Sequence, residues 1–272
     1  MTRGKAEGRA ACELPRWLWL YLPVLSVVVY WLSPLMGYER WRLVMVSEQG
    51  LLENATVLFL LPAIVLSVLV FRRRRELPRF VGVWMLLCGL GAFYFGAEEL
   101  SWGQVWLGLE TPEAIHELSV STKADESFAL HNLDWWGRPL LNQAPRLSLT
   151  VACLVGGVIL PLVLRGRRQR PETVRKPWYW IVPTLPLMPA SVLAVFSTVP
   201  GKILGLVGRP PAGSYASMAF VESSGELKEY AFALVLMLYV LSVYRRLQGR
   251  GGRDLKRDEK SGGYIIKACH GT

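Results

Sequence analysis

The sequence lacks the motifs on which the common soluble enzymes depend. It contains no glycine-rich phosphate loop, dinucleotide-binding fingerprint, His-Glu-x-x-His zinc motif or nucleophile elbow. It has only three histidines in 272 residues, and its four cysteines include no close pair. These absences argue against a nucleotide-dependent enzyme, a zinc protease or a serine hydrolase of a familiar type.

The placement of cysteine and of charge argues against two further classes. Cys12, Cys88, Cys153 and Cys269 fall in the basic N-terminus, two apolar segments and the basic tail, so no disulfide framework is expected. The net charge is +10, but the basic residues stand in short runs between apolar segments rather than on one soluble face. Nucleic acid is therefore not an expected partner.

Long apolar stretches are what the sequence does contain. The apolar fraction is 52%, only 19% of residues are charged, and there are 11 tryptophans. Six segments of about 20 residues are long enough to cross a membrane. They cover residues 17–35, 51–71, 80–100, 147–164, 178–199 and 227–244. The sequence predicts an all-α integral membrane bundle of six transmembrane helices, the fifth kinked by Pro183, Pro186 and Pro189.

The basic residues predict the orientation of this bundle. The segments before the first helix, between the second and third, between the fourth and fifth, and after the sixth hold 23 of the 31 lysines and arginines. By the positive-inside rule, both termini are cytoplasmic in a bacterial inner membrane. We expect a cytoplasmic segment 1–16, a membrane domain 17–246 and a disordered basic cytoplasmic tail 247–272. Residues 101–146 would form an external cap with a short interfacial helix at 111–118.

The most informative polar feature is Glu98-Glu99, at the outer, C-terminal end of the third helix. The helix dipole disfavours negative charge there, and carboxylates at membrane depth usually serve a function. Glu99 continues a stripe of small residues, so we expect it to face the bundle, with Glu98 turned toward Gly91 and Phe95. The stripe consists of Gly89, Ala92 and Gly96 before Glu99, and Gly103 after it. The simpler alternative is a hydrated pair, or one structural salt bridge to Arg138 or Lys202.

Other polar candidates fall on the same predicted side of the membrane. Glu226 and Glu229 share a face of the sixth helix with Glu222, although acids at a helix start often only stabilise that start. Glu53-Asn54 opens the second helix, where capping is an alternative explanation. His131-Asn132 lies in the external loop, where a histidine is often only solvated.

We expect these groups to converge on one external pocket. Its principal members would be Glu99, Glu98, His131 and Glu226, supported by Glu53, Asn54, Ser101, Asn132 and Glu229. The carboxylates of Glu99 and Glu226 would lie roughly within 8 Å of each other, as a metal or water bridge requires. Such a site suits either a divalent metal or a pair of carboxyl groups in acid–base chemistry, and the spacing does not identify a cofactor.

The run Glu98-Glu99-Leu100-Ser101-Trp102-Gly103-Gln104, with Glu53-Asn54 before it and His131-Asn132 after it, resembles a group of uncharacterised bacterial multi-pass inner-membrane proteins. The resemblance covers residues 48–133 and implies no activity. The same region has a fainter similarity to the alkaline-ceramidase-like membrane hydrolases. That similarity implies a zinc site with several histidines, including a His-x-x-x-His pair near the C-terminus, where this chain has Glu226 and Glu229 instead.

The leading functional hypothesis is a hydrolase or transferase at the outer membrane face, acting on a lipid or lipid-linked substrate. Glu99 would be the general acid/base or a ligand, with Glu98, His131 and Glu226 as its partners. The alternatives are a proton- or cation-coupled transporter and a non-enzymatic assembly partner of an envelope complex. The cytoplasmic halves of the helices look apolar, which favours a one-sided pocket over a transport path. Membrane lipid is the expected partner, and the sequence assigns no protein partner.

Overall fold

The computed structural model describes residues 14–46, 50–100, 107, 143–168, 176–207 and 215–258. Within these ranges the chain is 91% helical and has no strand. Six helical segments are long and apolar enough to cross a membrane, which confirms the predicted all-α membrane bundle. They are Trp17–Met36, Leu51–Arg72, Arg79–Glu99, Ala144–Gly166, Pro177–Ile203 and Ser224–Gly249. Because successive segments run in opposite directions, Met36, Glu99 and Ser224 lie at one end of the bundle, called the Glu99 end below.

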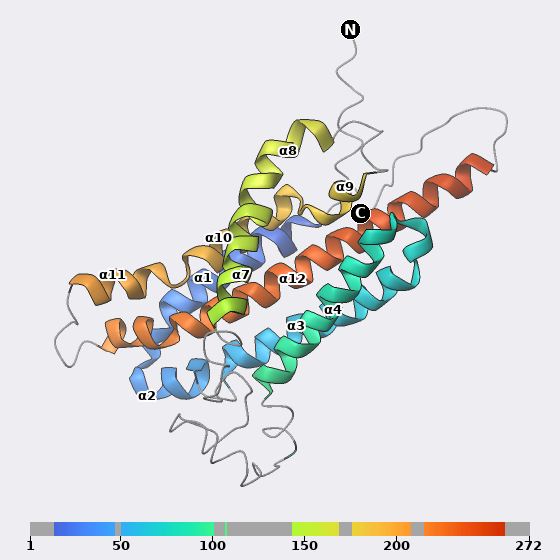
Figure 1. The fold of residues 1–272 in the computed structure, drawn as a ribbon. Coiled ribbons are helices and arrows are strands. Elements are labelled where there is room, and N and C mark those ends of the chain that lie inside the picture. Colours follow the sequence, from blue (N-terminus) through green and yellow to red (C-terminus); the bar gives the residue numbers. More distant parts are fainter. Residues whose placement is uncertain are drawn as a thin grey trace.

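Helices α3 (Leu51–Arg72) and α4 (Arg79–Glu99) form an antiparallel hairpin joined by the short turn η6 (Arg74–Glu76). Figure 1 shows them side by side on one flank of the bundle. The predicted small-residue stripe makes their close approach possible. A Cβ added at Gly89 would lie 2.9 Å from the Ser67 Cβ, and one at Gly96 would lie 3.6 Å from a Leu60 methyl carbon. The stripe therefore holds α4 against α3.

Helix α12 (Tyr215–Asp258) is the centre of the bundle (Figure 1). It runs between the α3–α4 hairpin and the group formed by α1 (Leu22–Leu32) and α10 (Met188–Phe196). Between residues 224 and 249, where its side chains are described, seven apolar side chains are fully buried: Ala231, Ala233, Leu234, Leu238, Val240, Val243 and Leu247. Hydrogen bonds tie neighbours to it, among them one from Trp84 Nε1 to the Tyr239 hydroxyl at 2.7 Å and one between Ser26 and Tyr230 at 2.5 Å.

Helix α12 also extends farther than the sequence indicated. It continues to Asp258, into the segment 247–272 that was expected to form the tail, and residues 259–272 lie outside the described ranges. Extending an existing helix adds one hydrogen bond for each residue fixed and avoids the cost of nucleation. A charged, glycine-containing segment that is unpromising in isolation can therefore continue a long helix.

The first and fourth segments lie at the outside of the bundle. The first joins η3 (Trp17–Tyr21) to α1 and η4 (Ser33–Met36), and ends at Gly37, whose φ of +91° suits glycine. The short helices α2 (Tyr38–Trp41) and η5 (Arg42–Val46) follow it. The fourth joins α7 (Ala144–Val151), the π-helical η11 (Ala152–Ile159) and α8 (Leu160–Arg168). Exposed apolar side chains cover both, including Leu25 and Val163, as expected of surfaces that face lipid.

The fifth segment is broken where its prolines predict a kink. It consists of α9 (Pro177–Ile181), η13 (Leu185–Leu187), α10 and α11 (Val199–Val207). Pro183 has no N–H to donate to the Tyr179 carbonyl four residues earlier. The guanidinium of Arg246 on α12 donates to that carbonyl at 2.5 Å and to the Trp180 carbonyl at 3.2 Å. A side chain from the central helix thus replaces the hydrogen bonds that the break removes.

Candidate functional site

Three carboxylates meet at the Glu99 end of the bundle. One carboxylate oxygen from each of Glu99, Glu226 and Glu229 lies within 4.8 Å of the others. Glu99 is the last residue of α4, and the other two stand on α12. The predicted approach of Glu99 and Glu226 is therefore confirmed.

Local helix geometry explains this convergence. Glu226 and Glu229 are three residues apart, which places both on one face of α12. Glu99 follows Gly96 by three residues on the same face of α4. The stripe that packs α4 against α3 therefore also sets the direction of Glu99, which meets the acids of α12. The expectation that Glu99 faces the bundle is confirmed by these contacts.

Three basic residues, one each from α7, α11 and α12, accompany the acids. Arg146 on α7 forms an ion pair with Glu229, and its positive charge also acts on Glu99. Lys228 stands between the two α12 acids in sequence, and its ammonium group lies 5.5 Å from the centre of the Phe232 ring. The charges of Lys202 on α11 and of Arg146 both act on Lys228. We call Arg146, Lys202 and Lys228 the basic row, and Glu99, Glu226 and Glu229 the acidic cluster.

Sequence reasoning missed the role of the basic row. Lys202 appeared only as a structural partner for the Glu98-Glu99 pair, while Arg146 and Lys228 were not identified. A signal was present, because these are three of only eight basic residues outside the four strongly basic segments. A basic residue retained on the side that is otherwise poor in lysine and arginine is a candidate for binding an anion.

Glu98 was expected to lie toward Gly91 and Phe95 of its own helix and to belong to the site. It is only 7% exposed, its charge acts on Tyr94 one turn earlier on α4, and it is not one of the three acids of the cluster. Spacing within α4 predicts which face of the helix carries Glu98. It does not predict which neighbouring elements cover that face. Glu98 is therefore a buried acid beside the cluster, with Tyr94 as a neighbour.

Glu53 and Asn54 have different surroundings. The negative charge of Glu53, in the first turn of α3, acts on Glu99 and thereby adds to the cluster. The Asn54 amide instead donates to the Gly50 carbonyl at 2.9 Å, at the start of its own helix. This bond ends on a carbonyl and satisfies no free N–H of the first turn, so it is not the capping considered for this pair.

Ser101, His131, Asn132 and Arg138 lie outside the described residues, as does the expected interfacial helix at 111–118. Their place in the site stays a prediction. Comparison with protein-family models, curated proteins and solved structures finds no match to this chain. The fold defines the class as a multi-pass membrane protein with six helices able to span the bilayer.

Proposed function

We propose that this chain is an enzyme of the bacterial inner membrane that acts, at the outer face, on a lipid or lipid-linked substrate bearing a phosphate group. The observation that carries the proposal is the placement of the acidic cluster beside the basic row at one membrane end. Arginine and lysine are suited to hold a phosphate, and carboxylates are suited to proton transfer or to binding a hard cation.

The proposed chemistry divides the work between the two groups. The basic row binds the phosphate, and the guanidinium of Arg146, which already pairs with Glu229, connects that phosphate to the acids. In a hydrolysis, one carboxylate takes a proton from the attacking water as its oxygen bonds to phosphorus. A protonated partner gives its proton to the oxygen that leaves. Glu99 is our candidate for one of these two roles.

The interior of the bundle supports a one-sided site. Below the cluster, all side chains of α12 from Ala231 to Leu238 are apolar, and the buried polar residues Ser242 and Arg246 lie toward the other end of the bundle. A transport path through the membrane needs polar groups along its length, because a desolvated ion without partners is costly. This arrangement favours chemistry at one face over transport through the bundle.

The proposal is tested with purified protein in nanodiscs that contain a total bacterial lipid extract. Lipids are quantified by mass spectrometry after incubation with Mg²⁺, Mn²⁺, Zn²⁺ or EDTA. We expect one phosphate-bearing lipid class to be converted, and Glu99→Gln to slow this conversion by about 100-fold or more, because it removes proton exchange while keeping side-chain shape. If EDTA abolishes conversion, the carboxylates bind a divalent cation. If conversion continues in EDTA, the carboxylates act in acid–base chemistry.

The matched control is Glu39→Gln, an exposed acid on α2 at the same end of the bundle. It should leave conversion unchanged. Thermal unfolding of each variant separates lost activity from lost folding. Conversion by Glu99→Gln at the wild-type rate, or no lipid change under any of the four conditions, would refute the proposal.

A further inference from the structure

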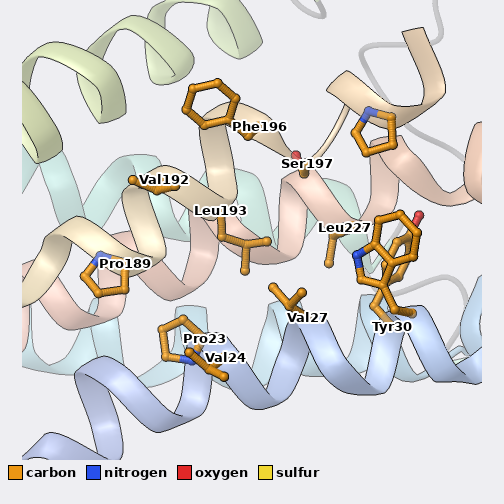
Figure 2. A pocket seen from close by; sticks show the side chains of 12 residues that line it. Pro23, Val24, Val27, Tyr30, Pro189, Val192, Leu193, Phe196, Ser197 and Leu227 are labelled. Carbon is orange, nitrogen blue, oxygen red and sulfur yellow. The ribbon is translucent and has the colours of Figure 1, made fainter. Parts of the chain in front are cut away.

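A hollow of about 260 Å³ lies between α1 and α10, with Leu227 of α12 at its back (Figure 2). Pro23, Val24 and Val27 form the α1 wall, and Pro189 and Leu193 belong to the α10 wall. These side chains are all apolar. Its walls α1 and α10 lie across α12 from the α3–α4 hairpin (Figure 1), and no residue of the acidic cluster lines the hollow.

The hollow opens sideways from the bundle. Val24, Trp31 and Phe196 line it and are 51%, 48% and 54% exposed, while Tyr30 and Leu227 are 4% and 3% exposed. The rim thus faces the surroundings and the back is closed by the protein. Both walls belong to segments that are long and apolar enough to span a membrane, so the opening faces hydrocarbon.

The length of the hollow matches one leaflet. Its α10–α11 wall runs from Pro189, in the middle of the fifth segment, to Pro200 near the Glu99 end. The 11 steps between these two residues correspond to roughly 16 Å of helix at the usual rise. The hydrocarbon core is about 30 Å thick, so the hollow extends from near the membrane midplane to one surface.

Size and polarity identify the kind of occupant. A helix about 10 Å across and 16 Å long occupies on the order of 1,300 Å³, far more than the hollow holds. Among the residues that line it, hydroxyl groups occur only on Tyr30 and Ser197, and Ser197 Oγ already donates to the Ala194 carbonyl at 3.4 Å. The walls thus suit a slender apolar chain and offer little to a polar group.

We propose that this hollow is a lipid site that holds one acyl chain of a phospholipid from the leaflet at the Glu99 end. The chain fills the space between α1 and α10 and presses on Leu227. Glu226 adjoins Leu227 on α12, so the bound lipid braces the turn that begins the acidic cluster. The site does not depend on the proposed enzymatic function, because no residue of the acidic cluster lines the hollow.

The test uses native mass spectrometry of protein released from nanodiscs made with a single phosphatidylglycerol. Activation is raised until loosely attached lipid is removed. The wild-type protein should retain one phospholipid. Leu193→Trp, which fills the hollow from α10, should reduce the retained fraction at least tenfold. Leu58→Trp is the control, because Leu58 is a 64% exposed residue of α3 on another flank, and it should retain lipid as the wild type does.

Val24→Trp is a second variant, on the exposed rim of α1, for use if Leu193→Trp does not fold. Its thermal unfolding should match that of the wild type in detergent, and it should lose the retained lipid. No retained phospholipid in the wild type, or equal retention by the Val24 and Leu58 variants, would overturn the lipid site. A mass showing a second copy of the chain, retained in place of lipid and lost only in the Val24 variant, would instead assign the hollow to a dimer contact.

Discussion

At the residue scale, Arg246 is a charged residue near one end of the bundle that is only 8% exposed. It donates to three backbone carbonyls, those of Ser242, Tyr179 and Trp180, and lies 5.5 Å from the Tyr179 ring centre. Two of these carbonyls belong to α9, just before the proline-induced break. Hydrogen bonding to the backbone therefore compensates for removing this charge from water.

Replacing Arg246 with alanine should destabilise the protein by about 3 kcal/mol, because it leaves the α9 carbonyls without these donors. Arg246→Lys should recover only part of this loss, since an ammonium group cannot reproduce the planar fork of donors. The measurement is the unfolding temperature in detergent. The exposed neighbour Arg245, changed to alanine, is the control, and equal effects at the two positions would contradict the assigned role.

Gly157 on η11 and Ser191 on α10 form the tightest helix contact among the described glycines. A Cβ at position 157 would lie 2.6 Å from the Ser191 Cβ and closer still to its Oγ. Gly157→Ala should therefore lower stability by about 1–3 kcal/mol, as other overpacked cores do. Gly156→Ala meets only Pro183 Cδ at 4.0 Å and should be tolerated.

The contact also provides a rescue experiment. Adding Ser191→Gly to Gly157→Ala should restore much of the lost unfolding temperature, because it removes the atoms that the new methyl group meets. A double variant no more stable than the single one would show that the cost arises elsewhere.

The candidate site was predictable only where one helix determines the position of a side chain. Glu226 and Glu229 follow from their spacing on α12, and Glu99 follows from the glycines that precede it on α4. Arg146 reaches the cluster through the packing of α7, and Lys202 on α11 is near enough for its charge to act on Lys228. Such contacts depend on how separate helices are aligned, which a pattern within one segment does not specify.

At the scale of elements, hydrogen bonds between helices fix the position of α12 among its neighbours. The bond from Trp84 to Tyr239 joins α4 to α12 across residues 155 apart in sequence. We expect the single variants Trp84→Phe and Tyr239→Phe each to be less stable than the wild type. A double-mutant cycle should give a coupling of about 0.6 kcal/mol, the usual size for such bonds in membrane bundles. Additive effects would show that the bond does not stabilise the pair.

Most helix boundaries were predicted within three residues, because length and hydropathy are enough to define a membrane segment. The second segment, expected at 51–71, is Leu51–Arg72, and the third, expected at 80–100, is Arg79–Glu99. Boundaries fail where hydropathy does not determine the structure. Helix α12 continues through charged residues to Asp258. The prolines of the fifth segment predicted a kink, but they did not indicate that Arg246 would donate hydrogen bonds to the carbonyls left free there.

At the scale of the whole molecule, the proposed orientation is tested with single cysteines in a variant whose four native cysteines are replaced. A cysteine at Asp125 should react with a membrane-impermeant maleimide from outside intact spheroplasts. Cysteines at Arg74 and Arg168 should react only after the membrane is opened, because basic loops remain in the cytoplasm. Labelling of the Asp125 variant only from the cytoplasmic side would reverse the proposed orientation and the face assigned to the site.

The central position of α12 bears on how the protein is made. The ribosome synthesises this helix after the other five membrane segments. Yet α12 is the helix that α3, α4 and α10 all contact, and it carries two of the three clustered carboxylates. Until it enters the bilayer, the earlier segments have only their contacts with one another, such as those of α3 with α4 and of α1 with α10. Assembly of the bundle and completion of the acidic cluster therefore coincide in one late step. A nascent chain that stalls before residue 215 should be inserted but remain open to membrane proteases, and so never display a partly formed site.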